Sequence, residues 1–79
     1  MKDIFANTEK PFVWRDISEI IPTVIPPINE ELKKDILENG MKHPLMLNQF
    51  HLILGGNERY AIFKQLNIKR IPVRYYHIP

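Results

Sequence analysis

The chain of 79 residues contains no cysteine and only three glycines. Without thiols it can build neither a disulfide scaffold nor a thiolate zinc site, and cysteine-based catalysis is excluded. No apolar run approaches the ~20 residues of a membrane span, and the first ten residues lack the apolar core of a signal peptide. These absences predict a cytoplasmic protein in a reducing environment with no membrane contact.

One small domain is all that 79 residues can hold, and a composition of 44% hydrophobic and 25% charged residues is typical of a folded globule. The charges are divided unevenly along the chain. Residues 1–40 carry five basic and eight acidic side chains, whereas residues 41–79 carry six basic and one acidic side chain. The second half is therefore expected either to present a positive face to phosphate or an acidic partner, or to attract the first half within the fold.

The first half of the chain predicts a strand, an extended connection and a helix. The strand is expected near residues 12–16 and is followed by a bend. Three prolines within residues 22–27 then exclude both a helix and a central strand. Asn29 is typical of a helix N-cap and Gly40 of a left-handed helix end, so a helix is expected over residues 30–39.

The second half predicts a hairpin, a helix and a strand. Two short apolar runs, residues 44–49 and 51–55, are expected to pair as the hairpin. Helical spacing over residues 57–66 predicts the second helix, and residues 71–76 predict the last strand. Pro72 lacks an N–H group, so it is expected at a sheet edge or at the first position of its strand. The order strand, helix, hairpin, helix, strand indicates an α+β fold.

The domain itself is expected over residues 11–79, preceded by a polar and flexible N-terminus at residues 1–10. Trp14 and Phe63 are assigned to the core, because so small a protein has few other large side chains with which to fill it.

The segment that is most informative about function consists of Gly55, Gly56, Asn57, Glu58 and Arg59, where a strand runs through two glycines into a helix. Glycine lets the backbone approach a ligand closely, and the N–H groups at a helix start attract anions, phosphate above all. The Arg59 guanidinium in the first turn can bind phosphate oxygens. The alternative is a plain strand-to-helix turn in which Arg59 is solvated or paired with a carboxylate.

The loop before the hairpin carries Lys42 and His43. An imidazole at this position can contact phosphate or act as an acid or base, and the alternative is a solvated side chain. The other histidines, His51 and His77, have no chelating spacing, so no metal site is expected.

The order of these parts, together with the sequences GMKHP, GGNERY and IPV, resembles the ParB/sulfiredoxin superfamily over residues 17–76. Within the superfamily, the sequence resembles the ParB-like N-terminal (ParB-like nuclease) domain. The resemblance implies a small α+β domain with a short mixed sheet, a β-hairpin and two main helices. In chromosome-partitioning members the matching segments hold a nucleoside triphosphate, usually CTP. By resemblance, Gly40, Pro44, Gly56 and Arg59 belong to such a site.

The sequence departs from these relatives at three of the matched positions. His43 stands where partitioning proteins commonly have glutamine, and Asn57 and Glu58 replace the Glu-Arg of their Gly-Glu-Arg-Arg motif, so one phosphate-binding charge is lost. In sulfiredoxins a catalytic cysteine follows the glycine, and Asn57 at that position excludes sulfinic-acid repair. Free-serine kinases and ParB-like nucleases also share the fold, which leaves Glu58 as a candidate catalytic base.

These observations predict a non-enzymatic binding module for a nucleotide or nucleic-acid phosphate, with CTP or ATP plus magnesium as the candidate ligands. The expected ligand-binding residues are Gly40, Lys42, His43, Pro44, Gly55, Gly56, Asn57 and Arg59. Electrostatic contacts to DNA or to an acidic partner are expected from Lys64, Lys69, Arg70 and Arg74. The resemblance does not extend to a helix-turn-helix domain, so sequence-specific operator binding is not expected.

The alternative is a small phage- or plasmid-type regulator that binds a host protein through the basic half of the chain. A third hypothesis, a small phosphotransferase or nuclease with Glu58 as base, ranks below both. Phosphate binding weakens steeply with ionic strength and an apolar protein interface does not, so salt dependence separates the first two.

Overall fold

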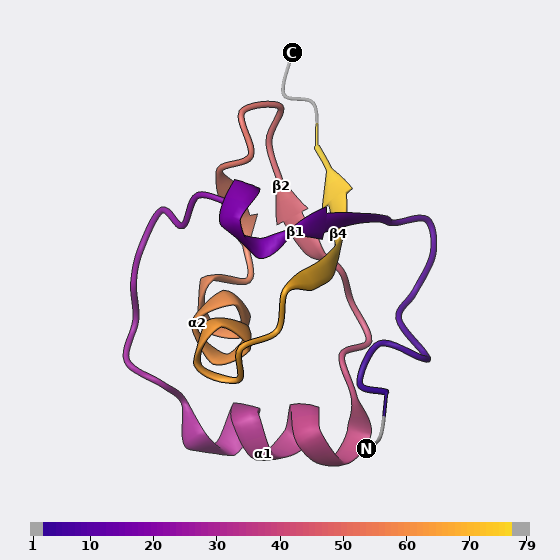
Figure 1. The fold of residues 1–79 in the computed structure, drawn as a ribbon, viewed down its shortest axis with the longest axis vertical. Coiled ribbons are helices and arrows are strands. Elements are labelled where there is room, and N and C mark those ends of the chain that lie inside the picture. The colour runs from indigo at the N-terminus through magenta and orange to yellow at the C-terminus, as the bar shows by residue number, and fades with distance from the viewer. Residues whose placement is uncertain (1–2, 77–79) are drawn as a thin grey trace.

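The structure is a computed structural model and describes residues 3–76. Its elements, in chain order, are β1 (Val13–Asp16), the 3-10 turn η1 (Ile17–Glu19), α1 (Glu30–Asn39), β2 (Leu45–Leu47), β3 (Ile53–Gly55), α2 (Asn57–Gln65) and β4 (Arg70–Tyr75). Figure 1 shows α1 lying across one end of the molecule and the β2–β3 hairpin at the opposite end. The predicted order of elements is confirmed, and so is the α+β fold.

The four strands form one mixed sheet in the order β1-β4-β2-β3. β4 is antiparallel to β1 and parallel to β2, while β2 and β3 form the predicted antiparallel hairpin. Gly55, at the end of β3, pairs with Met46 in β2. The turn that leads from β3 into α2 therefore lies at the same end of the sheet as the loop that leads from α1 into β2.

Residues next to the helix termini determine where α1 starts and where both helices end. The Asn29 side chain accepts a hydrogen bond from the Leu32 N–H at 3.1 Å, which caps the start of α1. At the other end of α1, Gly40 takes the left-handed φ of 82° that its lack of a Cβ permits. Asn67, just beyond α2, is also left-handed with a φ of 58°, as expected for an asparagine that ends a helix.

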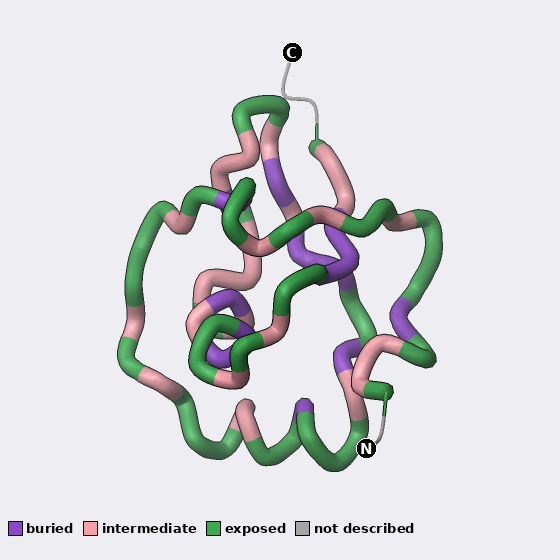
Figure 2. The backbone as a smooth tube through the Cα atoms, viewed as in Figure 1, coloured by how far each residue is buried: buried purple, intermediate pink, exposed green. Residues whose placement is uncertain are grey.

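The core lies between the sheet and the two helices. Figure 2 shows buried residues on β2, β4 and α2. The fully buried large side chains come from these elements, from α1 and β3, and from the loop between α1 and β2: Phe63, Ile36, Met41, Leu45, Leu47, Ile53, Ile62, Ile71, Val73 and Pro72. Phe63 is in the core as predicted.

The prediction for Pro72 was wrong, because β4 is a central strand. Pro72 lies opposite Trp14 of β1, and the pairing of β4 with β2 begins only at Val73. The proline therefore sits where β4 has a paired neighbour on one side only. A missing N–H group is tolerated at such a position, because no second ladder needs it.

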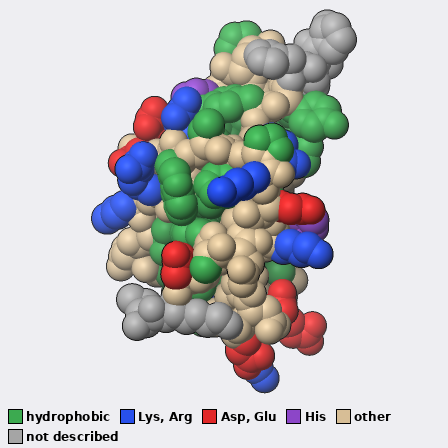
Figure 3. Space-filling view, turned by 90° about the vertical axis from the view of Figure 1, so that its right-hand side faces the viewer, with side chains coloured by type: hydrophobic (Ala, Val, Ile, Leu, Met, Phe, Trp, Pro, Cys, Tyr) green, Lys and Arg blue, Asp and Glu red, His purple; other side chains and the backbone are tan. Residues whose placement is uncertain are grey.

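The assignment of Trp14 to the core was also wrong. Its side chain is 41% exposed, because β1 is an edge strand. The place beside Phe63 is taken instead by Phe5, whose ring centroid lies 5.5 Å from that of Phe63 and 5.6 Å from that of Trp14. Such edge-to-face pairs stabilise aromatic clusters without full burial. Figure 3 shows hydrophobic side chains that reach the surface between charged groups on one face of the molecule.

The N-terminal segment covers part of the core in the structure. Ile4 and Phe5 pack against the core cluster, and the Met41 N–H donates to the carbonyl of Ile4 at 2.7 Å. The buried hydroxyl of Thr8 donates to the carbonyl of Met41 at 2.6 Å. The domain boundary at residue 10 stays a prediction, and residues 3–9 contribute contacts to the same fold.

Asp16 caps the turn η1. Its Oδ1 accepts the Ser18 N–H at 2.9 Å and the Ser18 hydroxyl at 2.7 Å. The backbone hydrogen bond, and after it the hydroxyl, lower the pKa of Asp16 below its ordinary 3.8, and nearby Lys69 and Arg70 act in the same direction.

A carboxyl group whose pKa is lowered by folding stabilises the fold above its unfolded pKa and loses that contribution as pH falls through the folded pKa. We expect the wild type to be more stable than Asp16→Ala at about pH 6, and the difference to shrink once the pH drops below 3.8. Urea unfolding of both proteins at several pH values measures the difference. A difference that stays constant down to about pH 2 would contradict the role of Asp16.

Within residues 3–76, no helix is long and apolar enough to span a membrane. Within the same residues, no group of three His, Asp or Glu side chains could hold a metal ion.

Candidate functional site

The candidate site begins at the first turn of α2. Gly56 precedes the helix with a left-handed φ of 112°, and no side chain caps the helix start. The first hydrogen bond of the helix runs from the Tyr60 N–H to the carbonyl of Gly56 at 2.9 Å. The N–H groups that come before it in the first turn have no carbonyl partner in the preceding turn, and together with the helix dipole they attract negative charge.

Gly56 is also required by packing. A Cβ on this residue would overlap the Cδ2 atom of Leu45, a buried residue at the start of β2. The α2 start is thus held directly against the beginning of β2, next to Pro44. The two segments that the sequence analysis proposed as one site meet at this contact between Leu45 and Gly56.

Arg59 carries the positive charge of the first turn. Its side chain is partly exposed, and within residues 3–76 it forms no hydrogen bond or ion pair. Of the two alternatives considered from sequence, pairing with a carboxylate is therefore not found in this range. A guanidinium without a partner beside helix N–H groups can contact an anion.

Asn57 and Glu58 form contacts that sequence reasoning missed. The Asn57 amide oxygen accepts the N–H groups of Thr23 and Val24 at 3.1 and 3.4 Å, and its nitrogen donates to the Thr23 hydroxyl at 3.0 Å. The Glu58 carboxylate accepts from the Asn29 amide at 3.4 Å. The partners are 34 and 29 residues away along the chain, so no local pattern could reveal them.

The loop from α1 to β2 contributes Gly40, Lys42, His43 and buried Pro44. A Cβ on Gly40 would lie 2.8 Å from the Ile4 carbonyl oxygen, so this glycine has a packing role. The side chains of Lys42 and His43 are exposed at the surface.

His43 has an acidic neighbour in the N-terminal segment. Its Nδ1 atom lies 2.9 Å from a carboxylate oxygen of Glu9, and the two side chains are 64% and 53% exposed. An ion pair this exposed adds little stability. The Glu9 carboxylate places negative charge beside His43, which opposes the approach of a phosphate to this side chain.

The four basic residues expected to contact nucleic acid or a partner are not equally available. The Arg74 guanidinium donates to the carbonyls of Pro11 and Glu9 at 2.8 and 3.3 Å, which ties β4 to the segment before β1. The Lys64 ammonium lies 5.8 Å from the centre of the Tyr60 ring. Lys69 and Arg70 are exposed and lie near Asp16. Part of the positive charge of the second half of the chain is therefore balanced by an acidic residue of the first half.

A polar network that the sequence did not predict joins the hairpin tip to β4 and η1. Arg15 donates through Nε to the Tyr75 hydroxyl at 2.9 Å, and that hydroxyl lies 3.1 Å from Nε2 of His51. The other ring nitrogen of His51 lies 3.1 Å from the carbonyl of Glu19. Every polar atom named here is paired within the network, so we assign it a structural role.

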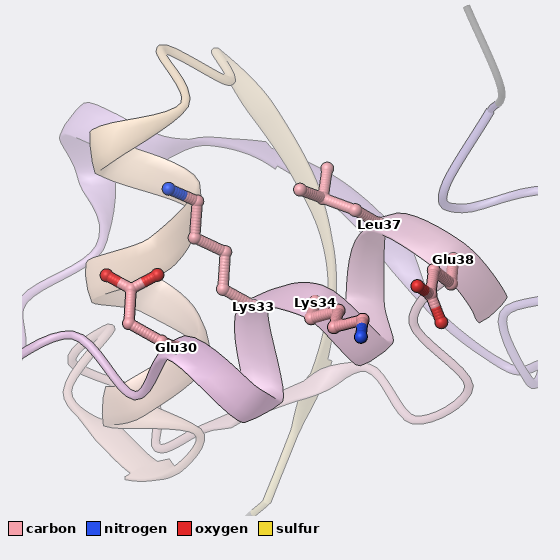
Figure 4. Close-up of a pocket in the computed structure, with 5 residues that line it drawn as sticks. All are labelled: Glu30, Lys33, Lys34, Leu37 and Glu38. Atoms are coloured by element: carbon pink, nitrogen blue, oxygen red, sulfur yellow. The ribbon is translucent and has the colours of Figure 1, made fainter.

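A hollow along α1 lies outside the candidate site. It is lined by Glu30, Lys33, Lys34, Leu37 and Glu38, which all belong to that helix (Figure 4). A surface formed by one helix alone offers no opposing wall to enclose a ligand.

Comparison with known proteins supports the fold. No protein-family model and no curated protein matches the sequence. Among solved structures, a Pnob8-like ParB N-domain matches 91% of this chain and 32% of its own, with 23% identity and a TM-score of 0.66. A conserved hypothetical protein from Pyrococcus furiosus matches 89% of this chain and 34% of its own, with 20% identity and a TM-score of 0.71.

A free serine kinase in complex with AMP is also similar, with 22% identity and a TM-score of 0.69 over 87% of this chain and 32% of the kinase. The chain thus spans about a third of the length of each of these structures. Identities this low establish architecture rather than activity. The chain has the ParB/sulfiredoxin-like α+β fold that the sequence resemblance predicted.

Proposed function

We propose that the chain binds the phosphate groups of a nucleotide at the turn from β3 into α2. The observation that carries the proposal is Arg59, a partly exposed guanidinium without a partner in residues 3–76, next to a helix start that no side chain caps. The free serine kinase of the same fold was solved with AMP and, as a variant, with ADP, which supports a nucleotide as the ligand.

Each residue of the site has a proposed role. The N–H groups of Gly56 and Asn57 donate to phosphate oxygens, and Arg59 adds positive charge. His43 and Lys42 lie at the rim, on the loop that reaches the same end of the sheet. The proposal concerns binding and assigns no catalytic residue. Magnesium enters with the nucleotide, as the counter-ion of its phosphates.

The test is to titrate CTP and ATP, each with magnesium, into the wild type and into Arg59→Ala by calorimetry. We expect Arg59→Ala to weaken nucleotide binding at least about tenfold, because hydrogen bonds between a guanidinium and phosphate are charge-assisted. The circular dichroism spectrum should stay unchanged, since Arg59 forms no hydrogen bond or ion pair within residues 3–76.

The matched control is Lys64→Ala, which removes the same charge from the last turn of the same helix. Lys64→Ala should bind nucleotide as the wild type does. Equal losses in the two variants would show that only overall charge matters, and full binding by Arg59→Ala would overturn the proposed site.

A further inference from the structure

The segment between η1 and α1 is held to the candidate site by polar contacts. We call residues 22–28 the strap; it contains Pro22, Pro26 and Pro27. The Asn57 side chain accepts from two strap N–H groups and donates to the Thr23 hydroxyl, as described above. The same hydroxyl donates to the carbonyl of Ile53 in β3 at 3.0 Å.

The other end of the strap is tied to the same turn of α2. Asn29, which caps α1 directly after the strap, donates to the Glu58 carboxylate. Asn57 and Glu58, the first two residues of α2, thus contact both ends of the strap. In the partitioning proteins that the sequence resembles, these two positions carry the Glu-Arg of the phosphate-binding motif.

Apolar packing holds the middle of the strap only weakly. Val24 and Ile25 are 60% and 83% exposed. Between the strap and the Tyr60–Lys64 face of α2 lies an open hollow of about 510 Å³. Ile28, at the end of the strap, packs against the core. The part of the strap before it has few buried apolar contacts and opens at low free-energy cost, so its position depends mainly on polar contacts, those of Asn57 among them.

We propose that the strap regulates the anion site by occupying the Asn57 side chain. One of the two N–H donors of the Asn57 amide is used by the Thr23 hydroxyl, and this N–H is not available to a phosphate bound at the first turn of α2. Release of the strap frees this N–H and adds one hydrogen bond to the anion. An anion therefore binds the released state more tightly, and its binding shifts the strap toward release. This inference rests on the proposed function.

Thr23→Val tests the coupling, because it removes the hydroxyl and keeps the shape of the side chain. We expect Thr23→Val to bind CTP or ATP with magnesium about two- to tenfold more tightly than the wild type, as the loss of one competing hydrogen bond implies. Ile25→Thr is the control, because Ile25 lies in the strap, is 83% exposed and is not among the hydrogen-bond partners of Asn57 in the described residues. The affinity of Ile25→Thr for nucleotide should match that of the wild type.

A second measurement needs no variant. The N–H groups of Thr23 and Val24 donate to Asn57, so addition of nucleotide to the wild type should speed their hydrogen exchange. Unchanged or slower exchange of these two amides in the nucleotide complex would overturn the inference.

The outcomes separate the two proposals. If Arg59→Ala loses binding while Thr23→Val binds as the wild type does, the inference about the strap fails and the proposed function stands. If no variant and no wild-type sample binds nucleotide, the proposed function fails and the inference fails with it.

Discussion

Replacement of Gly56 by alanine is expected to lower the free energy of unfolding by about 2–5 kcal/mol. A residue with a Cβ costs roughly 1–2 kcal/mol in the left-handed region, and Gly56 has a φ of 112°. Overpacking against buried Leu45 adds about 1–3 kcal/mol. A domain of this size has a total stability of about 4–12 kcal/mol, so chemical denaturation should show a large shift of the midpoint.

Gly55 provides the control for this prediction. A Cβ on Gly55 would meet the Met46 Cβ at 3.9 Å, an ordinary contact distance, and its φ is not in the left-handed region. Gly55→Ala should therefore change the stability by less than about 1 kcal/mol. Equal effects of the two substitutions would contradict the argument that the α2 start is fixed by its contact with Leu45.

The substitution Phe63→Ala is expected to cost about 3–5 kcal/mol, the range for a large aromatic side chain removed from a core. Phe63 has no solvent exposure, and its ring packs edge-to-face on Phe5 at 5.5 Å. The substitution would leave a cavity between α2 and the rest of the core, because Phe63 is a fully buried residue of this helix. Thermal unfolding followed by circular dichroism measures the effect.

Phe50→Ala is the matched control, since Phe50 lies at the hairpin tip and is 68% exposed. Its removal should change stability by no more than about 0.5 kcal/mol. A loss for Phe63→Ala as small as that for Phe50→Ala would mean that the core is not centred on α2.

The parts of the fold that follow from neighbouring residues could be predicted from the sequence. Helix α1 has the predicted bounds because its cap, Asn29, and its end, Gly40, act within one turn of the helix. The hairpin was predicted from two apolar runs, although no glycine or Asn-Gly turn marks its tip; His51 supplies the left-handed residue there, with a φ of 66°.

The errors concern residues whose place is set by distant parts of the chain. Pro72 was expected at an edge, but the order of the strands places β4 between β1 and β2. Trp14 was expected in the core, but Phe5 from the N-terminal segment fills that place. Strand order and the path of the N-terminal segment are tertiary properties, and a local pattern does not contain them.

In the candidate site, too, the features set by neighbouring residues were predicted and those set by distant residues were not. Glycines before a helix and an arginine in its first turn are local signals, and they led to Gly56 and Arg59. The contacts of Asn57 with Thr23 and of Glu58 with Asn29 bridge 34 and 29 residues, so the role of the strap emerges only in the folded chain.

We propose that the α2 start and the α1–β2 loop bind a nucleotide together. An amide-resolved NMR titration of the full chain with CTP and with ATP, each with magnesium, tests this residue by residue. We expect shifts at residues 40–44 and 55–59 and at the strap amides of Thr23 and Val24, and not elsewhere. Absence of shifts at these residues at millimolar nucleotide, or shifts centred on Lys69 and Arg70 instead, would contradict a nucleotide site at the α2 start.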